Sequence, residues 1–365
     1  MNNKVKVIKS EKSWMESNAI EQLEKVSKLE GVVKAVGLPD LHFRKTPVGA
    51  SIVTKDVVYP HLAGNDIGCG MALFSTGISK GKFKFDKVRG KLQRLEGLEN
   101  VNITHLIEDI DLPMKEALGT IGSGNHFAEF QMIEKIYDEG ALEEIGLSKG
   151  EVYLLVHSGS RGYGEYVLKE YMDKYSCQNG LKKDSEGFRE YFEEHDKAVE
   201  FGKVNREMIA YRILSTIGSK DNAKVLDSVH NSIVVKEHGG EKLYVHRKGA
   251  APADVGYVVI AGTRGTNSYI VKPKADTFDN AYSVAHGAGR RWNRLSCRER
   301  LEIVYPEKSL RQKLLASNLI YNDKRVLYEE APEAYKSIDK VIEDMLNEGM
   351  ITLVATLKPL ITYKT

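Results

Sequence analysis

The sequence is poor in cysteine and lacks any long apolar run. Its three cysteines, Cys69, Cys177 and Cys297, are an odd and sparse set that gives no disulfide framework, which is typical of a reducing compartment. No stretch approaches the roughly 20 apolar residues that a membrane helix needs. No apolar run follows the N-terminal lysines, as one would in a signal peptide. We therefore expect a cytoplasmic protein with no membrane partner.

Net charge is also nearly absent, with 53 lysines and arginines against 51 aspartates and glutamates. The net charge therefore gives no indication of a nucleic-acid partner, although local basic patches remain compatible with one. Hydrophobic residues make up 42% of the chain and charged residues 28%, which is typical of a folded rather than a disordered protein. The 365 residues suffice for one large core or for two modest domains.

Helical and strand-like patterns are mixed along the chain, with no internal repeat and no low-complexity linker. Apolar spacing predicts helices over residues 17–30 and 187–217. A strand starting at residue 32 is expected to enter a turn at 37–39. Three further strands, 152–157, 232–238 and 257–262, are expected to be buried. The remaining expected strands are 50–60 and 351–364. This mixture predicts an α/β (mixed α+β) fold. Polar, glycine-rich loops follow several of the strands, where active sites are usually assembled.

Five residues of metal-binding type lie in those loops. Asp66 and Cys69 are three residues apart in GNDIGCG, while His126, His157 and His230 stand at junctions between strands and loops. Taken singly, each is also typical of a structural residue, such as a capping aspartate or a packed histidine. Together they suit a borderline metal, namely Zn, Fe, Ni or, with carboxylate help, Mn. Five ligands exceed the need of one tetrahedral ion, and a bridging thiolate would allow two.

Two further histidines are weaker candidates. His42, in LPDLHF, could contact a substrate phosphate. His246, in YVHRKGA, is as well explained by packing within a strand.

Four segments combine glycine with hydroxyl residues or arginine: GSGNH (122–126), HSGSRGYG (157–164), AGTRGTNSY (261–269) and HGAGRR (286–291). Glycine lets backbone N–H groups approach an anion, and arginine binds phosphate through two donors. None matches GxxxxGK[ST] or a strand-coupled GxGxxG, so P-loop and Rossmann sites are excluded. The set indicates a polyphosphate or nucleotide site. Within it, His286 is a candidate nucleophile towards phosphorus, although HGAGRR is equally typical of a turn before a basic helix.

The ordered series PDLH, GNDIGCG, GTIGSGNHFAE, VHSGSRG, HN, GTRGTNSY and HGAGR resembles the RtcB family of RNA ligases, from about residue 37 to the C-terminus. The resemblance implies a single RtcB-type domain over residues 1–365 with a central metal and nucleotide pocket. Two Mn²⁺ ions would be bridged by Cys69, one also held by Asp66 and His126 and the other by His157 and His230. GTP would guanylylate His286. The positions that match the family's guanosine contacts are Asn125, Phe127, Glu129 (which would bind the base edge), Asn231, Ala261, Gly262, Thr263, Arg264, Ser268, Gly287, Ala288, Gly289, Tyr335 and Lys364.

The implied reaction joins an RNA end bearing a 2′,3′-cyclic phosphate or 3′-phosphate to a 5′-hydroxyl end, in RNA repair or tRNA splicing. The chain departs from the common family form in FRKTP, in GTRGT and at Ala285. GNDIGCGM and TPVGA resemble a divergent branch associated with peptide-chain release factor H, which raises a functional link to that factor and a need for an accessory protein. Two alternatives remain: an RNA-end phosphoesterase or cyclic-phosphate hydrolase, which would use the metals without His286, and a non-catalytic RNA-binding scaffold.

Overall fold

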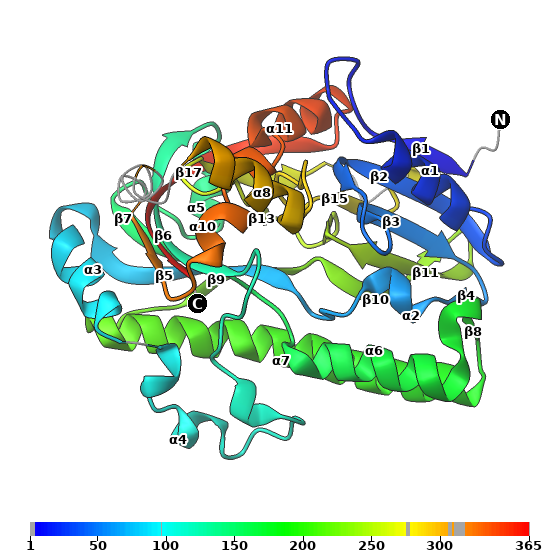
Figure 1. The fold of residues 1–365 in the computed structure, drawn as a ribbon, viewed down its shortest axis with the longest axis horizontal. Coiled ribbons are helices and arrows are strands. Elements are labelled where there is room, and N and C mark those ends of the chain that lie inside the picture. The colour runs from blue at the N-terminus through cyan, green and yellow to red at the C-terminus, as the bar shows by residue number, and fades with distance from the viewer. Residues whose placement is uncertain (1–3, 96, 275–277, 306–308, 310–317, 365) are drawn as a thin grey trace.

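Two main sheets form the framework of the chain, described here by a computed structural model for residues 4–95, 97–274, 278–305, 309 and 318–364 (Figure 1). In these residues the smaller sheet has the order β1-β2-β3-β11-β10. Its strands are β1 (Val5–Val7), β2 (Val32–His42), β3 (Val48–Thr54), β10 (Asn231–His238) and β11 (Glu241–Lys248). Helices and both kinds of strand pairing occur together, so the predicted mixed α/β fold is confirmed.

The larger sheet has the order β13-β14-β17-β6-β7-β5-β9, with β16 added beside β17. Its strands are β5 (Gly70–Ser79), β6 (Phe127–Ile136), β7 (Glu151–Ser158), β9 (Lys224–Val229), β13 (Val258–Ile260), β14 (Ser268–Pro273), β16 (Leu319–Tyr321) and β17 (Ile351–Lys364). Two short pairs complete the set: β4 (Val57–Val58) with β8 (Leu181–Lys182), and β12 (Ala250–Pro252) with β15 (Ser283–Ala285).

The helices lie around these sheets (Figure 1). They are α1 (Ser17–Val26), α2 (Pro60–Ala63), α3 (Phe85–Gln93), α4 (Thr104–Ile107), α5 (Glu139–Glu144), α6 (Gly162–Tyr175), α7 (Glu186–Ile217), α8 (Arg294–Val304), α10 (Arg325–Glu329) and α11 (Ile338–Asn347). None of the described helices combines the length and the apolarity that crossing a membrane requires.

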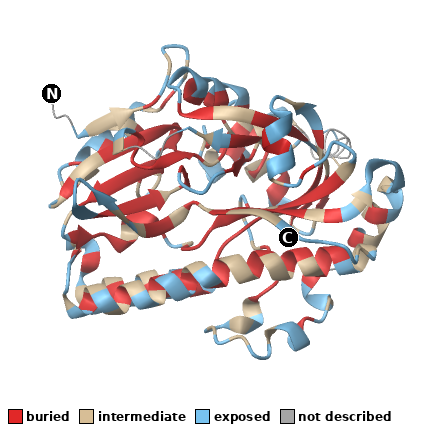
Figure 2. Cartoon of the chain, turned by 180° about the vertical axis from the view of Figure 1, so that it is seen from behind, coloured by how far each residue is buried: buried red, intermediate tan, exposed pale blue. Residues whose placement is uncertain are grey.

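Helix α7 runs the length of the molecule beneath the strands (Figure 1) and packs on β5, β7 and α6. It begins where Ser185 accepts a hydrogen bond from the Phe188 N–H and ends at Gly218, whose φ of 83° is a left-handed cap. Buried and exposed residues alternate along it with helical spacing (Figure 2), and Ile209 and Ile213 join the core of the larger sheet.

Most of the expected elements are present, with three corrections. The expected strand 50–60 is divided into β3 and β4 by a bend at Lys55 and Asp56, and Asp56 has a left-handed φ of 61°. The predicted turn at 37–39 is wrong, because β2 continues to His42 and only its pairing with β3 is interrupted after Gly37. Lys336 helps to hold this irregular stretch by donating to the Pro39 and Leu41 carbonyls. Strand 232–238 is present as β10, but its second half is not buried, because β10 is the sheet's outer strand and Val235 is 50% exposed.

Candidate active site

The five predicted metal ligands converge at one edge of the larger sheet. Asp66 and Cys69 lie in the turn that enters β5, His126 directly precedes β6, His157 lies near the end of β7, and His230 follows β9. Strands β6, β7, β5 and β9 are successive neighbours and antiparallel, so the starts of β5 and β6 meet the ends of β7 and β9. Strand pairing therefore brings together residues up to 164 positions apart (66 to 230).

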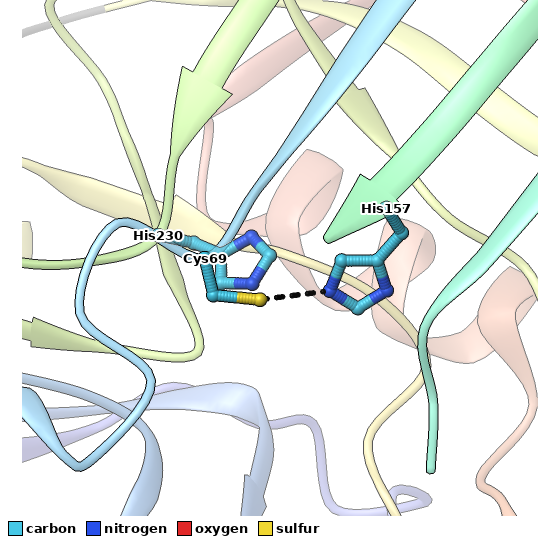
Figure 3. A group of neighbouring side chains, drawn as sticks. All are labelled: Cys69, His157 and His230. Carbon is cyan, nitrogen blue, oxygen red and sulfur yellow. Dashed lines mark hydrogen bonds between the residues drawn. The ribbon is translucent and has the colours of Figure 1, made fainter. Parts of the chain in front are cut away.

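Cys69 is shared by two clusters of potential ligands. Its Sγ lies 3.3 Å from His126 Nε2 and 3.3 Å from His157 Nε2. One cluster is Cys69, His157 and His230, and the other is Asp66, Cys69 and His126; within each, the ligand atoms lie within 4.8 Å of one another. Figure 3 shows the Cys69 thiol directed at His157, with His230 beside it. This arrangement can hold two cations on either side of one sulfur.

The chemistry of the donors fits bound cations. The buried atoms Asp66 Oδ1 and His230 Nδ1 have no hydrogen-bond partner in the described part of the chain, which is costly unless a ligand completes them. His126 Nδ1 lies 3.1 Å from the Ile121 carbonyl, to which it can donate, and Nε2 lies 2.9 Å from Asp66 Oδ2, where a cation bound between the two side chains would be coordinated by both. Burial holds the pKa values of His157 and His230 well below the usual range, so both imidazoles are neutral and able to coordinate.

The two acidic donors differ in what sets their ionisation. Burial, followed by the charge of Asp66, raises the pKa of the Cys69 thiol well above its ordinary value. Burial also opposes ionisation of Asp66, but its contacts with His126 and Cys69 outweigh burial and lower the pKa of this carboxyl. A cation at the shared sulfur would reverse the balance for Cys69 and deprotonate the thiol.

Two side chains of α7 hold the ligand-bearing loops in place. The fully buried Arg206 donates to the Gly68 carbonyl at 2.8 Å and to the Ser158 carbonyl at 2.9 Å, and it pairs with Asp227 at 2.6 Å. Asn205 accepts from the Gly119 N–H at 2.7 Å and donates to the Thr120, Ser158 and Gly159 oxygens. The close approach of α7 also explains a glycine on each side: a Cβ at Gly68 would lie 2.7 Å from the Ala198 oxygen, and a Cβ at Gly202 would lie 2.4 Å from the Gly68 oxygen.

His286 stands next to the ligand group and is held by a buried carboxylate. Its ring centroid lies 4.7 Å from that of His230. Its Nδ1 lies 2.6 Å from Asp40 Oδ2, which also accepts from the His286 backbone N–H at 3.3 Å. Because Nδ1 is engaged by Asp40, Nε2 is the ring nitrogen that remains for chemistry. Gly289 allows the Asp40 backbone to lie this close, since a Cβ at Gly289 would lie 2.3 Å from the Asp40 carbonyl oxygen.

A cavity of about 1080 Å³ opens over these residues. All the sequence-predicted site residues line it except Ser268, which lies behind the wall. Ser268 Oγ accepts from the Gly262 N–H and from Gln131 Nε2, both at 3.2 Å, so it supports the loop instead of facing the cavity. Asn231 lines the cavity, and its side-chain amide also donates to the Asp66 carbonyl and accepts from the Gly249 N–H.

One end of the cavity is formed by Glu129 and Lys364. Glu129 is buried and receives hydrogen bonds from Gln131 and Thr362; burial raises the pKa of its carboxyl despite these contacts. Lys364 reaches the same region with its ammonium 6.0 Å from the Phe127 ring centroid, and burial lowers its pKa to about 8. A carboxylate acceptor, an ammonium donor and an aromatic ring are what a flat heterocycle with donors on one edge requires.

Arginines line the wall between this end and His286. Arg290 pairs with Glu330 at 3.0 Å and lies over the Tyr335 ring at 4.9 Å. Arg264 has two buried nitrogens, Nε and Nη1, without a partner in the described residues, and burial lowers its pKa to about 10. An unpaired buried guanidinium facing a cavity is suited to an anion.

The two weaker histidine candidates, His42 and His246, lie in different environments. His42 lines the cavity, and burial keeps its pKa well below the usual range. His246 is a packed strand residue, because its Nε2 accepts from the Tyr59 N–H at 2.9 Å and its Nδ1 lies 3.1 Å from the Ile52 oxygen.

Residue-by-residue reading of the sequence did not single out Asp40, Asn205, Arg206 or Glu330. Asp40 lies in the PDLH motif, and this position is a sequence signal by which it could have been identified as a partner for a histidine nucleophile. Asn205 and Arg206 lie inside a long helix with no local sign of their role, and Glu330 lies among other acidic residues.

Fold and site together define a candidate metal-dependent enzyme with a pocket for a nucleotide. A family model described as tRNA-splicing ligase RtcB matches residues 22–104 and 98–365. An RNA-splicing ligase RtcB2 of Escherichia coli is 40% identical over 371 residues, which cover 100% of this chain and 96% of that protein. The chain therefore belongs to the RtcB family, as the resemblance of its motifs implied.

Two more distant relatives are also named tRNA-splicing ligases. The tRNA-splicing ligase RtcB of Thermococcus kodakarensis is 29% identical, with 94% of this chain and 90% of that protein covered. The tRNA-splicing ligase RtcB of Archaeoglobus fulgidus is 28% identical, with 95% and 91% covered.

Proposed function

We propose that this protein is a GTP-dependent RNA ligase that joins a 2′,3′-cyclic phosphate or 3′-phosphate RNA end to a 5′-hydroxyl end through guanylylated His286. The observation that carries the proposal is the pairing of two ligand clusters through Cys69 beside a histidine whose Nδ1 is held by Asp40. Membership of a family whose relatives are named RNA-splicing ligases supports the same activity.

The proposed cofactor is a pair of Mn²⁺ ions. Cys69 would bridge them, Asp66 and His126 would complete the site of one, and His157 and His230 that of the other. When bound, the ions neutralise phosphoryl oxygens and favour attack by a hydroxyl group. Mixed sulfur, nitrogen and oxygen donors are compatible with Mn²⁺ without selecting it over zinc or iron, so metal identity has to be measured.

In the proposed series of reaction steps, His286 is a nucleophile that becomes modified and is then regenerated. Its Nε2 attacks the α-phosphorus of GTP, a P–N bond forms and pyrophosphate leaves. A cyclic phosphate end is first hydrolysed by water, which breaks the bond to the 2′-oxygen and leaves a 3′-phosphate. An oxygen of the RNA 3′-phosphate then attacks the phosphorus bound to His286, the P–N bond breaks, and GMP is transferred to the RNA. The 5′-hydroxyl finally attacks the RNA phosphate, loses its proton and displaces GMP. Asp40 orients the imidazole and stabilises the positive charge that develops when Nε2 attacks.

Selectivity for GTP is assigned to the Glu129 end of the cavity. A carboxylate can accept two hydrogen bonds from the N1–H and N2–H₂ edge of guanine, whereas adenine offers no such pair of donors. Lys364 is suited to the O6 and N7 acceptors of the same base, and the unpaired nitrogens of Arg264 to a phosphate. Cavity arginines and lysines would bind RNA phosphates in a salt-sensitive manner with little sequence preference.

Incubation with GTP labelled at the α-phosphate, together with Mn²⁺, tests this function. We expect an acid-labile protein adduct that is lost in His286→Ala and kept in His105→Ala, a matched change at an exposed histidine outside the cavity. Absence of an adduct in the wild-type protein, or its persistence in His286→Ala, would refute the assignment. Hydrolysis of a cyclic phosphate that survives in His286→Ala, with no adduct in any variant, would identify a metal-dependent phosphoesterase instead.

The functional link to a peptide-chain release factor, the need for an accessory protein and the cytoplasmic location stay predictions. Ligation assays with and without candidate proteins, and fractionation of cells, are the corresponding measurements.

A further inference from the structure

Both tryptophans of the chain lie together on the surface beside the cavity. Trp14 belongs to the loop between β1 and α1, and Trp292 follows the HGAGRR loop. The Arg291 guanidinium lies 5.5 Å from the Trp14 ring centroid and 5.9 Å from that of Trp292, and Arg300 of α8 lies 4.9 Å from the Trp292 ring (elements in Figure 1). These four residues are called the Trp–Arg platform below.

The platform is open to solvent. Trp14 is 50% exposed, Arg291 and Arg300 are exposed, and Trp292 is half-buried against Cys297 and Leu301. Large aromatic residues usually bury most of their surface, so a half-exposed indole beside a second one marks a contact surface.

The charges of the platform are also uncompensated. Within the described ranges no carboxylate lies within ion-pair distance of Arg291 or Arg300, whereas Arg298 on the same helix pairs with Glu302 at 2.7 Å. Stacking on an indole leaves the N–H groups at the edge of a guanidinium free to donate. The platform therefore offers aromatic faces together with donors for anions.

Two contacts connect the platform to the cavity. Arg290, which lines the cavity, donates from Nε to the Trp292 carbonyl at 3.1 Å. On the other side, Glu16 accepts from the Phe43 N–H at 3.2 Å, which ties the Trp14 loop to the segment that contains the cavity-lining Arg44. A chain that leaves the cavity past Arg44 and Arg290 would meet the platform next.

We propose that the Trp–Arg platform binds single-stranded RNA next to the end that reacts at His286, an inference that rests on the proposed ligase function. Bases would stack on the indoles, and phosphates would be bound by Arg291 and Arg300. A single strand fits because its bases present free faces, whereas those of a duplex are covered by their neighbours. A protein partner also favours tryptophan and arginine, but unpaired cations that continue from a phosphate-handling cavity favour a polyanion.

The chain offers a direct spectroscopic test, because its only two tryptophans are both in the platform. Selective excitation of tryptophan during titration with a short single-stranded RNA bearing a 3′-phosphate should show saturable quenching. Trp14→Phe and Trp292→Phe each leave one reporter, and both should respond. GTP alone, which occupies only the cavity, should leave the signal nearly unchanged.

Affinity measurements separate this proposal from a merely structural role. Trp14→Ala should weaken binding of the single strand about tenfold, within the range for loss of one stacked base, and Trp14→Phe should recover most of it. Arg291→Ala should weaken binding and reduce its dependence on salt. Tyr137→Ala is the matched control: this ring is 44% exposed, carries Lys135 at 4.4 Å and lies outside the cavity wall.

Guanylylation by labelled GTP distinguishes the two proposals, because it needs no RNA. Trp14→Ala that forms the adduct at the wild-type rate and binds RNA less tightly supports the platform. If Trp14→Ala and Arg291→Ala both bind RNA with wild-type affinity and are still guanylylated, the proposed RNA-binding role of the platform is overturned while the ligase assignment stands. The platform would then be assigned to docking of a protein. Absence of the adduct in the wild-type protein would instead overturn the ligase assignment.

Discussion

Replacement of Asp40 by asparagine isolates what the buried carboxylate does for His286. Asp40 is fully buried, and its Oδ2 accepts from both Nδ1 and the backbone N–H of His286. Asparagine has nearly the same volume, so the substitution removes the negative charge without opening a cavity. The neutral amide is also less costly to bury than the carboxylate, so we expect no loss of thermal stability.

The expected kinetic effect follows from the hydrogen bond at 2.6 Å. A hydrogen bond to a charged group contributes about 1.5–3 kcal/mol, which corresponds to about 10- to 150-fold in rate. If the amide nitrogen faces the ring, Nδ1 becomes the acceptor and the proton moves to Nε2, which removes the lone pair needed for attack. We therefore expect guanylylation of Asp40→Asn to be slowed about 100-fold.

Single-turnover labelling at saturating GTP and Mn²⁺ measures this rate, and thermal unfolding measures stability. Asp344→Asn provides a matched control, because Asp344 is also buried and accepts a backbone hydrogen bond from Ser10 at 3.2 Å without contacting His286. Wild-type guanylylation in Asp40→Asn would show that Asp40 is only a structural partner of the loop, and its assigned role in orienting His286 would have to be abandoned.

Three further changes test other parts of the site. Cys69→Ala should lower the bound manganese below two ions per chain in elemental analysis, and an unchanged stoichiometry would exclude a bridging thiolate. Glu129→Gln should reduce the preference for GTP over ATP by about 10- to 100-fold in competition binding, since a charged acceptor is replaced by an amide; an unchanged ratio would move base recognition elsewhere. Burial lowers the pKa of Lys364 to about 8, so its positive charge is lost as pH rises through about 8, and GTP affinity should fall over that range. Lys364→Met should bind more weakly at pH 7 and show a flatter profile; an unaltered profile would remove Lys364 from the pocket.

Two of the three departures from the common family form line the cavity, whereas Ala285 is buried in β15. Arg264, in GTRGT, places in the cavity wall two nitrogens, Nε and Nη1, that have no partner among the described residues, and Arg44, in FRKTP, lines the same cavity. Both add positive charge without touching the Cys69 clusters or the Asp40–His286 pair. The divergence is therefore expected to alter substrate choice more than the chemical steps.

Much of the site could be predicted from the sequence, because the combination of residue types that carries its chemistry is uncommon outside metal and phosphate sites. An aspartate and a cysteine in a glycine-rich turn, three histidines at strand–loop junctions and the glycine- and arginine-rich segment HGAGRR indicate metal and phosphate chemistry from local signals. Among the strands around the site, apolar runs predicted β7, β10, β13 and β17 but not β5, β6, β9 or β15, and helical spacing predicted α7.

Only the tertiary structure decided which of these residues meet. The pairing of β6, β7, β5 and β9 depends on long-range contacts, so the sharing of Cys69 by two clusters has no local sequence signature. Asn205, Arg206 and Asp40 act through partners that are distant in sequence, and Ser268 turned out to lie behind the wall because its hydroxyl is used by Gly262 and Gln131. Residue types determine which reactions are chemically available, whereas the distances and hydrogen bonds that select among them arise only when the strands are paired.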